Sequence, residues 1–106
     1  MRIATWNVNS VKARRERLLA FLDRHAPDVV CLQELKTEEP GFPREELRAA
    51  GWASAVLGQK TYNGVAVLAR EEPADLATGF GDGVDESQAR LVAATVGGLR
   101  VASAYI

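Results

Sequence analysis

The chain is poor in chemically reactive side chains, since its 106 residues include one cysteine and one histidine. A lone cysteine excludes an internal disulfide, and Cys31 lies in the apolar run 28–32, where a small buried side chain is expected. His25 falls at the end of an expected helix, away from the strand ends considered below, so we assign it no acid–base role. Met1 leads directly into a strand-like pattern, so we expect no signal peptide.

Long apolar runs and an excess of charge of one sign are also missing. No stretch approaches the ~18 apolar residues of a membrane span. The formal net charge of −1 gives no global attraction to polyanions, so contact with nucleic acid would need a local patch. The length allows one domain at most, and the apolar fraction of 47% is ordinary for a globular protein. We therefore expect a cytoplasmic protein that does not contact membranes.

The first third of the chain predicts two strands around one helix. Residues 3–8 form a strand-like run, and residues 28–33 are apolar almost throughout, which is typical of a strand covered on both faces. Ser10 is expected to cap a helix over residues 11–24. This order predicts parallel strands joined by a right-handed crossover.

From residue 52 onward the hydrophobic pattern has a period of two. A short helix over residues 43–50 precedes it, and a hairpin turn is expected at Gly97-Gly98. A polar, acidic, glycine-rich loop is expected at residues 79–87, and strands are expected at residues 52–57, 64–70, 74–78, 90–96 and 99–106. The order of elements predicts an α/β sandwich with helices outside. Because the last run has no polar terminator, we expect residues 1–106 to be the N-terminal portion of a single domain, roughly half of it.

Two polar side chains stand where the first two expected strands end. Asn7 ends the first apolar run, and Glu34 ends the second. A single crossover can bring both to one rim of a sheet, where hard oxygen ligands suit Mg²⁺ and a phosphate. The residues alone leave open the alternatives of a turn residue for Asn7 and a solvated strand end for Glu34.

Further candidates are cations and polar loop residues. Lys12 and Lys36 follow the two strand ends closely, so each can hold a backbone phosphate or simply be solvated. The segment 58–64 combines a cation, an aromatic ring and amides, which suits phosphate and sugar contacts as well as an ordinary connection. Arg90 either enters a DNA groove or lies at a sheet edge. Tyr105 is by itself more typical of a packed sheet aromatic.

Together, the strings at residues 3–14, 27–36 and 58–68 resemble the exonuclease III-type apurinic/apyrimidinic (AP) endonucleases of the endonuclease/exonuclease/phosphatase superfamily. The resemblance implies a four-layer α/β sandwich of the DNase I-like kind and hydrolysis of phosphodiesters with Mg²⁺ or Mn²⁺. Members cut DNA on the 5′ side of abasic sites, and many also remove groups from 3′ ends. The expected partner is double-stranded DNA with abasic sites or 3′ ends, and the complete protein is expected to be a monomer.

The resemblance also implies roles for single residues. Glu34 corresponds to the metal carboxylate, Asn7 to its partner, and Tyr105 to the active-site tyrosine at the scissile phosphate. Asn9 stands where some relatives carry an aspartate. Seven positions correspond to residues at or near the DNA, namely Lys12, Lys36, Gln59, Lys60, Tyr62, Asn63 and Arg90.

The strings that supply the catalytic base and a phosphate-binding histidine in the family do not occur in this sequence. We therefore expect the isolated 106-residue chain to be poorly active or inactive. Two alternative interpretations are a catalytically incompetent DNA-binding or interaction fragment and a small-molecule or lipid phosphatase of the same superfamily.

Overall fold

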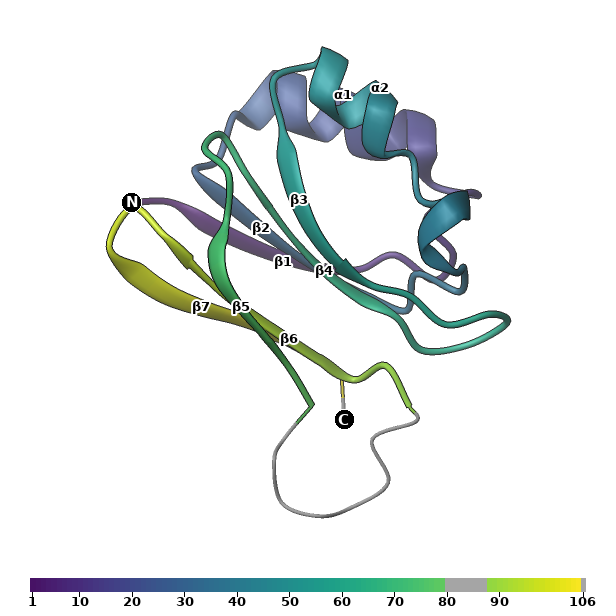
Figure 1. Ribbon diagram of the computed structural model, residues 1–106. Helices are drawn as coiled ribbons and strands as arrows, with labels where there is room; N and C mark the ends of the chain where they lie inside the picture. Colours follow the sequence, from purple (N-terminus) through teal and green to yellow (C-terminus); the bar gives the residue numbers. More distant parts are fainter. Residues whose placement is uncertain (80–87, 106) are drawn as a thin grey trace.

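The computed structural model describes residues 1–79 and 88–105, which form three layers: α-helices, a four-stranded sheet and a three-stranded sheet (Figure 1). Strands β1 (Ile3–Asn7) and β2 (Val29–Gln33) are parallel neighbours, with Asn7 opposite Gln33. Helix α1 (Arg15–His25) connects them. The predicted strand–helix–strand unit is therefore confirmed.

Helix α1 begins four residues later than the sequence predicts. The backbone N–H of Ser10 donates to the carbonyl of Glu34 (2.9 Å), and that of Val11 donates to the carbonyl of Leu35 (3.0 Å). These bonds hold residues 10 and 11 beside the continuation of β2, with Ser10 at a φ of 84°. The Ser10 hydroxyl accepts a hydrogen bond from the N–H of Ala13 (3.3 Å). Ser10 thus stabilises a turn before the helix and does not cap the helix, which corrects the prediction.

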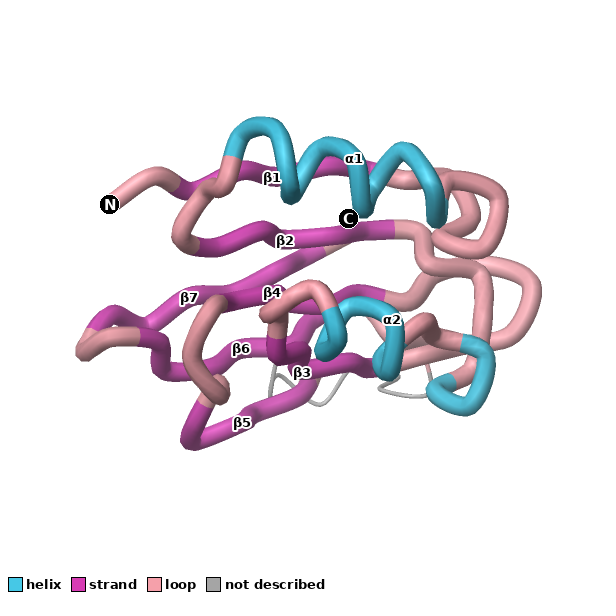
Figure 2. The backbone as a smooth tube through the Cα atoms, turned by 90° about the horizontal axis from the view of Figure 1, so that it is seen from above, coloured by secondary structure: helices cyan, strands magenta, loops and turns pink. Residues whose placement is uncertain are grey.

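The four-stranded sheet has the order β1-β2-β4-β3, and every residue of its two central strands is buried. Its other elements are a 3₁₀ turn (Glu39–Gly41), α2 (Arg44–Ala49), β3 (Ala53–Leu57) and β4 (Val65–Ala69). Figure 2 shows α1 over β1 and β2, and α2 on the same face of the sheet near β3 and β4.

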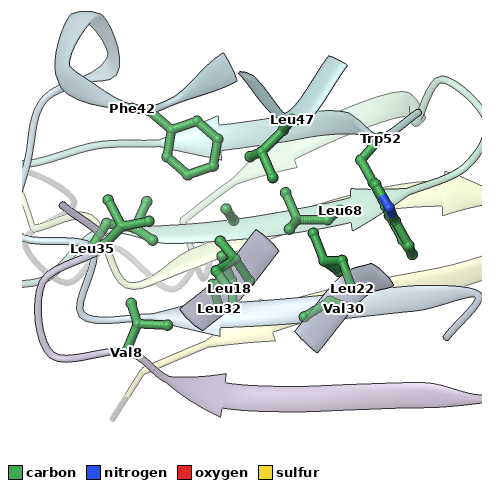
Figure 3. Packing of buried hydrophobic residues seen from close by; sticks show 12 residues of the cluster. Val8, Leu18, Leu22, Val30, Leu32, Leu35, Phe42, Leu47, Trp52 and Leu68 are labelled. Carbon is green, nitrogen blue, oxygen red and sulfur yellow. The ribbon is translucent and has the colours of Figure 1, made fainter. Parts of the chain in front are cut away.

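The core beneath the helices is made by leucines from several elements. Leu18 and Leu22 of α1 lie against Val30 and Leu32 of β2, and Leu47 of α2 closes the same cluster (Figure 3). Burial of these side chains stabilises each helix on the sheet, because apolar area leaves water.

The second sheet consists of β5 (Ala74–Thr78), β6 (Leu91–Val96) and β7 (Leu99–Ala104) in that order. The predicted turn at Gly97-Gly98 is present, with φ values of 56° and 79°, and joins β6 to β7. The inner face packs on the first sheet through an apolar cluster that includes Val67, Val92 and Val101.

Both α-helices lie on the first sheet, so the described residues make three of the four layers of the predicted sandwich. Most of the predicted loop at residues 79–87, and the last residue of the predicted strand 99–106, lie outside the described residues. Within the described part of the chain, no helix is long and apolar enough to cross a membrane.

Candidate active site

Three segments meet at one end of the first sheet, at the right of Figure 1, and we call residues 7–12, 34–37 and 58–64 the rim. The backbone N–H of Val8 donates to the carbonyl of Gln33 (3.0 Å), which extends the pairing beyond β1. The N–H groups of Leu35 and Lys36 donate to the carbonyls of Gly64 (3.1 Å) and Asn63 (3.0 Å). The predicted convergence of the first two strand ends is thus observed, and the loop before β4 joins them.

The rim holds an unusual share of the strained backbone. Left-handed φ values cost energy for residues other than glycine and often mark functional sites. Among described non-glycine residues, the positive φ values outside the rim belong to Ala26 and Asp75. Those within the rim belong to Asn9, Ser10, Glu34, Lys36, Thr61 and Asn63.

Glu34 and Tyr105 meet at the rim although they come from different sheets. The Tyr105 hydroxyl donates a hydrogen bond to Oε1 of Glu34 (3.3 Å). Tyr105 directly follows β7, and its N–H donates to the carbonyl of Arg90 (2.8 Å). The Arg90 guanidinium lies 5.5 Å from the centre of the Tyr105 ring, so a positive charge faces the aromatic ring beside the carboxylate.

Asn7 and Asn9 supply amide oxygens from the rim segment that follows β1. Oδ1 of Asn7 accepts the backbone N–H of Asn9 (3.2 Å), and Oδ1 of Asn9 accepts a hydrogen bond from Nζ of Lys36 (2.5 Å). Each amide oxygen has a second lone pair that a cation could use. Asn7 is exposed and Glu34 is half-buried, so both are open to solvent.

The donor set suits a hard cation. Mg²⁺ prefers oxygen ligands, commonly takes one or two carboxylates and keeps several waters. Glu34 with Asn7 meets this description. Within residues 1–79 and 88–105, no three histidine, cysteine, aspartate or glutamate side chains converge, so Glu34 is not part of a closed metal cage in this part of the chain.

The predicted DNA-binding residues divide into exposed and enclosed ones. Lys12 and Lys60 are exposed, and the Tyr62 side chain is 56% exposed. Asn63 is 4% exposed, and its Nδ2 donates to Oε1 of Gln59 (3.2 Å). Oε1 of Gln59 also accepts a hydrogen bond from the backbone N–H of Ala89 (2.7 Å), two residues before β6. Gln59 and Asn63 thus hold the loop together, and their contact with DNA stays a prediction.

Sequence reasoning missed a buried pair of polar side chains, Gln33 and Ser103, that lies next to Glu34 and Tyr105 along the chain. Gln33 and Ser103 are 9% and 1% exposed, and they hydrogen-bond each other across the two sheets (3.0 Å). A glutamine at the end of an otherwise apolar strand is the signal that could have found it, because buried amides need partners.

The lone cysteine and histidine lie where the sequence predicts. Cys31 is buried in the cluster between the sheets, and desolvation raises the pKa of its thiol above the ordinary value. His25 packs against Phe21 in the last turn of α1, with the ring centres 5.1 Å apart and the rings tilted by 38°. Neither belongs to the rim.

Comparison with known proteins yields consistent relatives. Residues 4–105 match the Endonuclease/Exonuclease/phosphatase family. Exodeoxyribonuclease III of Haemophilus influenzae is 34% identical over 94 residues, which cover 89% of this chain and 35% of that protein. An AP endonuclease structure from Archaeoglobus fulgidus is 35% identical with a TM-score of 0.95, covering 100% of this chain and 41% of the other.

A third relative was solved with nucleic acid. The structure of a 3′ phosphatase from Neisseria bound to a product DNA hairpin is 44% identical with a TM-score of 0.95, covering 99% of this chain and 41% of that one. The chain therefore spans between a third and a half of the length of each of these relatives.

Proposed function

We propose, since this chain belongs to the endonuclease/exonuclease/phosphatase family, that the whole protein hydrolyses phosphodiester bonds of DNA in DNA repair, as an AP endonuclease and 3′ exonuclease. The similarity to an exodeoxyribonuclease III and to an AP endonuclease supports this activity. The observation that carries it is the hydrogen bond between the Tyr105 hydroxyl and Glu34, which joins the two predicted site residues. The substrate in this proposal is double-stranded DNA with abasic sites or 3′ ends, and the protein acts as a cytoplasmic monomer.

Glu34 and Asn7 would hold the divalent cation, Mg²⁺ or Mn²⁺. Glu34 supplies the negative charge, and the Asn7 oxygen supplies a neutral ligand or orients a water. A bound cation would polarise the phosphate and offset the negative charge that develops on it.

Tyr105 and the cations of the rim would position the phosphate. A phenol donates one hydrogen bond, so a phosphate oxygen that accepts from Tyr105 replaces Glu34 as its acceptor. The carboxylate is then free for the cation. Lys12, Lys36 and Lys60 would hold flanking phosphates, and such contacts fix the position of the strand without reading its sequence.

The proposal is tested on the full-length protein with a duplex that contains one abasic site. Incision should require Mg²⁺ or Mn²⁺ and stop on chelation. Glu34→Gln keeps the shape and removes the charge, and it should lower kcat/KM by more than about 100-fold. Glu72→Gln is the matched control, because Glu72 is exposed and forms a surface ion pair with Arg48 (3.6 Å) away from the rim. Equal activity of the two variants, or faster turnover of an inositol phosphate than of abasic DNA, would refute the proposal.

A second candidate function concerns the 106-residue chain by itself, as a DNA-binding fragment without turnover. The observation in its favour is that, among the described residues, Glu34 belongs to no group of three or more histidine, cysteine, aspartate and glutamate side chains that could hold a metal ion. We expect the isolated chain to bind abasic duplex DNA and to leave it intact in Mg²⁺. Incision by the isolated chain, lost in Glu34→Gln, would overturn this candidate.

A further inference from the structure

A small polar network crosses the apolar layer between the two sheets. Nε2 of Gln33 in β2 donates to the hydroxyl of Thr5 in β1 (3.0 Å) and to the hydroxyl of Ser103 in β7 (3.0 Å). The Ser103 hydroxyl donates in turn to the carbonyl of Leu32 (2.7 Å). Both amide hydrogens of Gln33 therefore have acceptors, and the second sheet is bonded twice to the end of β2.

The surroundings make this network different from ordinary core packing. The interface between the sheets is otherwise formed by side chains such as Val67 and Val101. Contacts between such groups are non-directional and allow small shifts of one sheet against the other. Hydrogen bonds depend strongly on distance and angle, so a satisfied polar network fixes the relative position of the strands that carry it.

The network lies next to the two residues that the proposed function uses. Gln33 directly precedes Glu34, and Ser103 is two residues before Tyr105. Glu34 has a φ of 56°, a conformation that persists only where neighbouring structure holds it. Its bond to the Tyr105 hydroxyl, at 3.3 Å, spans the same gap as the bond from Gln33 to Ser103.

We propose that Gln33 is a positioning residue, which acts through Ser103 to hold Glu34 of the first sheet at a fixed separation from Tyr105 of the second. This inference rests on the proposed function, because it assigns Glu34 to the cation and Tyr105 to the phosphate. Gln33 itself would contact neither the cation nor the phosphate. It sets the geometry in which a cation and a phosphate are held together.

The test compares three single variants and one double variant of the full-length protein. Gln33→Met keeps the length of the side chain and removes its hydrogen bonds, and Ser103→Ala removes the partner. Ser54→Ala is the matched control. Ser54 is a buried serine of the four-stranded sheet that also contains Gln33, and its hydroxyl has no hydrogen-bond partner. The first readout is Mn²⁺ affinity without DNA, from the electron paramagnetic resonance signal of free Mn²⁺. The second is kcat and KM on abasic duplex DNA, and the third is the unfolding midpoint.

We expect Gln33→Met to weaken Mn²⁺ binding about 10-fold, as outer partners of metal ligands commonly do. The value of kcat should fall by a similar factor while KM for DNA changes less than about twofold, because the phosphate contacts of the rim remain. The double variant Gln33→Met/Ser103→Ala should be no weaker in Mn²⁺ binding than the worse single variant, since the two residues act as one unit. Ser54→Ala should leave Mn²⁺ affinity, kcat and KM unchanged.

The inference is overturned if Gln33→Met binds Mn²⁺ as the parent does, or if the two single effects multiply in the double variant. It is also overturned if the fall in kcat is fully explained by the fraction of unfolded protein under the assay conditions, as calculated from the lower unfolding midpoint. Should Gln33→Met fail to fold, Ser103→Ala alone is read by the same criteria. A parent protein that binds Mn²⁺ but never cleaves abasic DNA would refute the proposed function, and the Mn²⁺ titration would still decide the role of Gln33.

Discussion

Single buried polar residues differ in whether they have a partner, and the difference predicts opposite effects of the same substitution. The Ser54 hydroxyl is buried without a hydrogen bond, so it bears a desolvation cost that nothing repays. Ser54→Ala should raise the free energy of unfolding by about 1 kcal/mol. Ser103→Ala should lower it by about 1–2 kcal/mol, because Gln33 loses an acceptor.

Urea denaturation of the two alanine variants beside the parent chain measures both changes. A stability loss in Ser54→Ala as large as that in Ser103→Ala would mean that the hydroxyl of Ser54 has an acceptor in solution. Such a result would contradict the statement that the buried Ser54 hydroxyl has no hydrogen-bond partner.

The buried thiol of Cys31 makes a prediction about pH. Desolvation raises its folded-state pKa, whereas the unfolded thiol has a pKa of about 8.5. Above that pH the unfolded state loses its proton first, so it binds fewer protons than the folded state and becomes relatively favoured. The contribution of Cys31 is therefore complete below pH about 8.5 and is lost as the pH rises through the folded-state pKa.

Cys31→Ala should remove this part of the decline in stability between about pH 8 and 10. Urea midpoints at several pH values, for the parent and the variant, check it. In the parent at pH 8, alkylation by iodoacetamide should be slow without urea and fast with it. A variant whose stability declines as steeply as that of the parent would show that other groups cause the decline.

The residues of the site were predictable to different degrees. Asn7 and Glu34 follow from local signals, since each ends an apolar run and one crossover joins the runs. The bond from Tyr105 to Glu34 depends on how two sheets face each other, and residue spacing alone favoured a packed aromatic. The network of Gln33 and Ser103 has the same dependence, so strand alternation could not reveal it.

At the scale of elements, the rim depends on a close approach between two loops. A Cβ atom on Gly58 would lie 2.6 Å from the carbonyl oxygen of Thr37 and 2.8 Å from the backbone nitrogen of Glu39. Both are main-chain atoms, so the loops must separate to admit a methyl group. Gly58→Ala should cost about 1–3 kcal/mol of stability and weaken the proposed DNA binding by the full-length protein.

Gly98→Ala is the matched control for this change. Gly98 has a φ of 79° and no atom within 4 Å of an added Cβ, so its cost of about 1 kcal/mol comes from backbone conformation. Hydrogen exchange should quicken around residues 37–39 and 58–64 in Gly58→Ala and remain unchanged there in Gly98→Ala. Unchanged exchange at those residues in both variants would contradict the close approach.

Element boundaries could be predicted where local signals decide them and not where distant bonds do. Strand β5 and the hairpin at Gly97-Gly98 lie at the predicted residues, because turn chemistry is local. The start of α1 was predicted too early, because the N–H groups of Ser10 and Val11 bond to the end of β2. The division of the strands into two sheets was also beyond local reasoning, since period-two patterns look alike in both.

At the scale of the whole molecule, the small net charge makes the placement of charge decisive. Within the described part of the chain, Arg15 pairs with Glu46 (3.2 Å), and Lys12 and Lys36 form no ion pair. Both lysines belong to the rim. Arg24 lies in the last turn of α1, at the end of the helix opposite to the rim. If the rim binds DNA, attraction should come from these lysines and not from the overall charge.

This arrangement predicts a salt signature for DNA binding by the full-length protein. Each phosphate contact that is lost should reduce the slope of log K against log salt by about 0.9. Lys12→Ala and Lys36→Ala should therefore each flatten the slope by about one contact and weaken binding equally for duplexes of different sequence, since phosphate contacts carry no sequence information. Arg24→Ala removes the same charge far from the rim and should leave the slope unchanged. Fluorescence anisotropy between 50 and 200 mM salt, roughly the range in which such contacts dominate, measures all three. An equal flattening in Arg24→Ala would mean that DNA binding depends on the net charge of the protein. It would contradict the assignment of the rim as the surface that binds DNA.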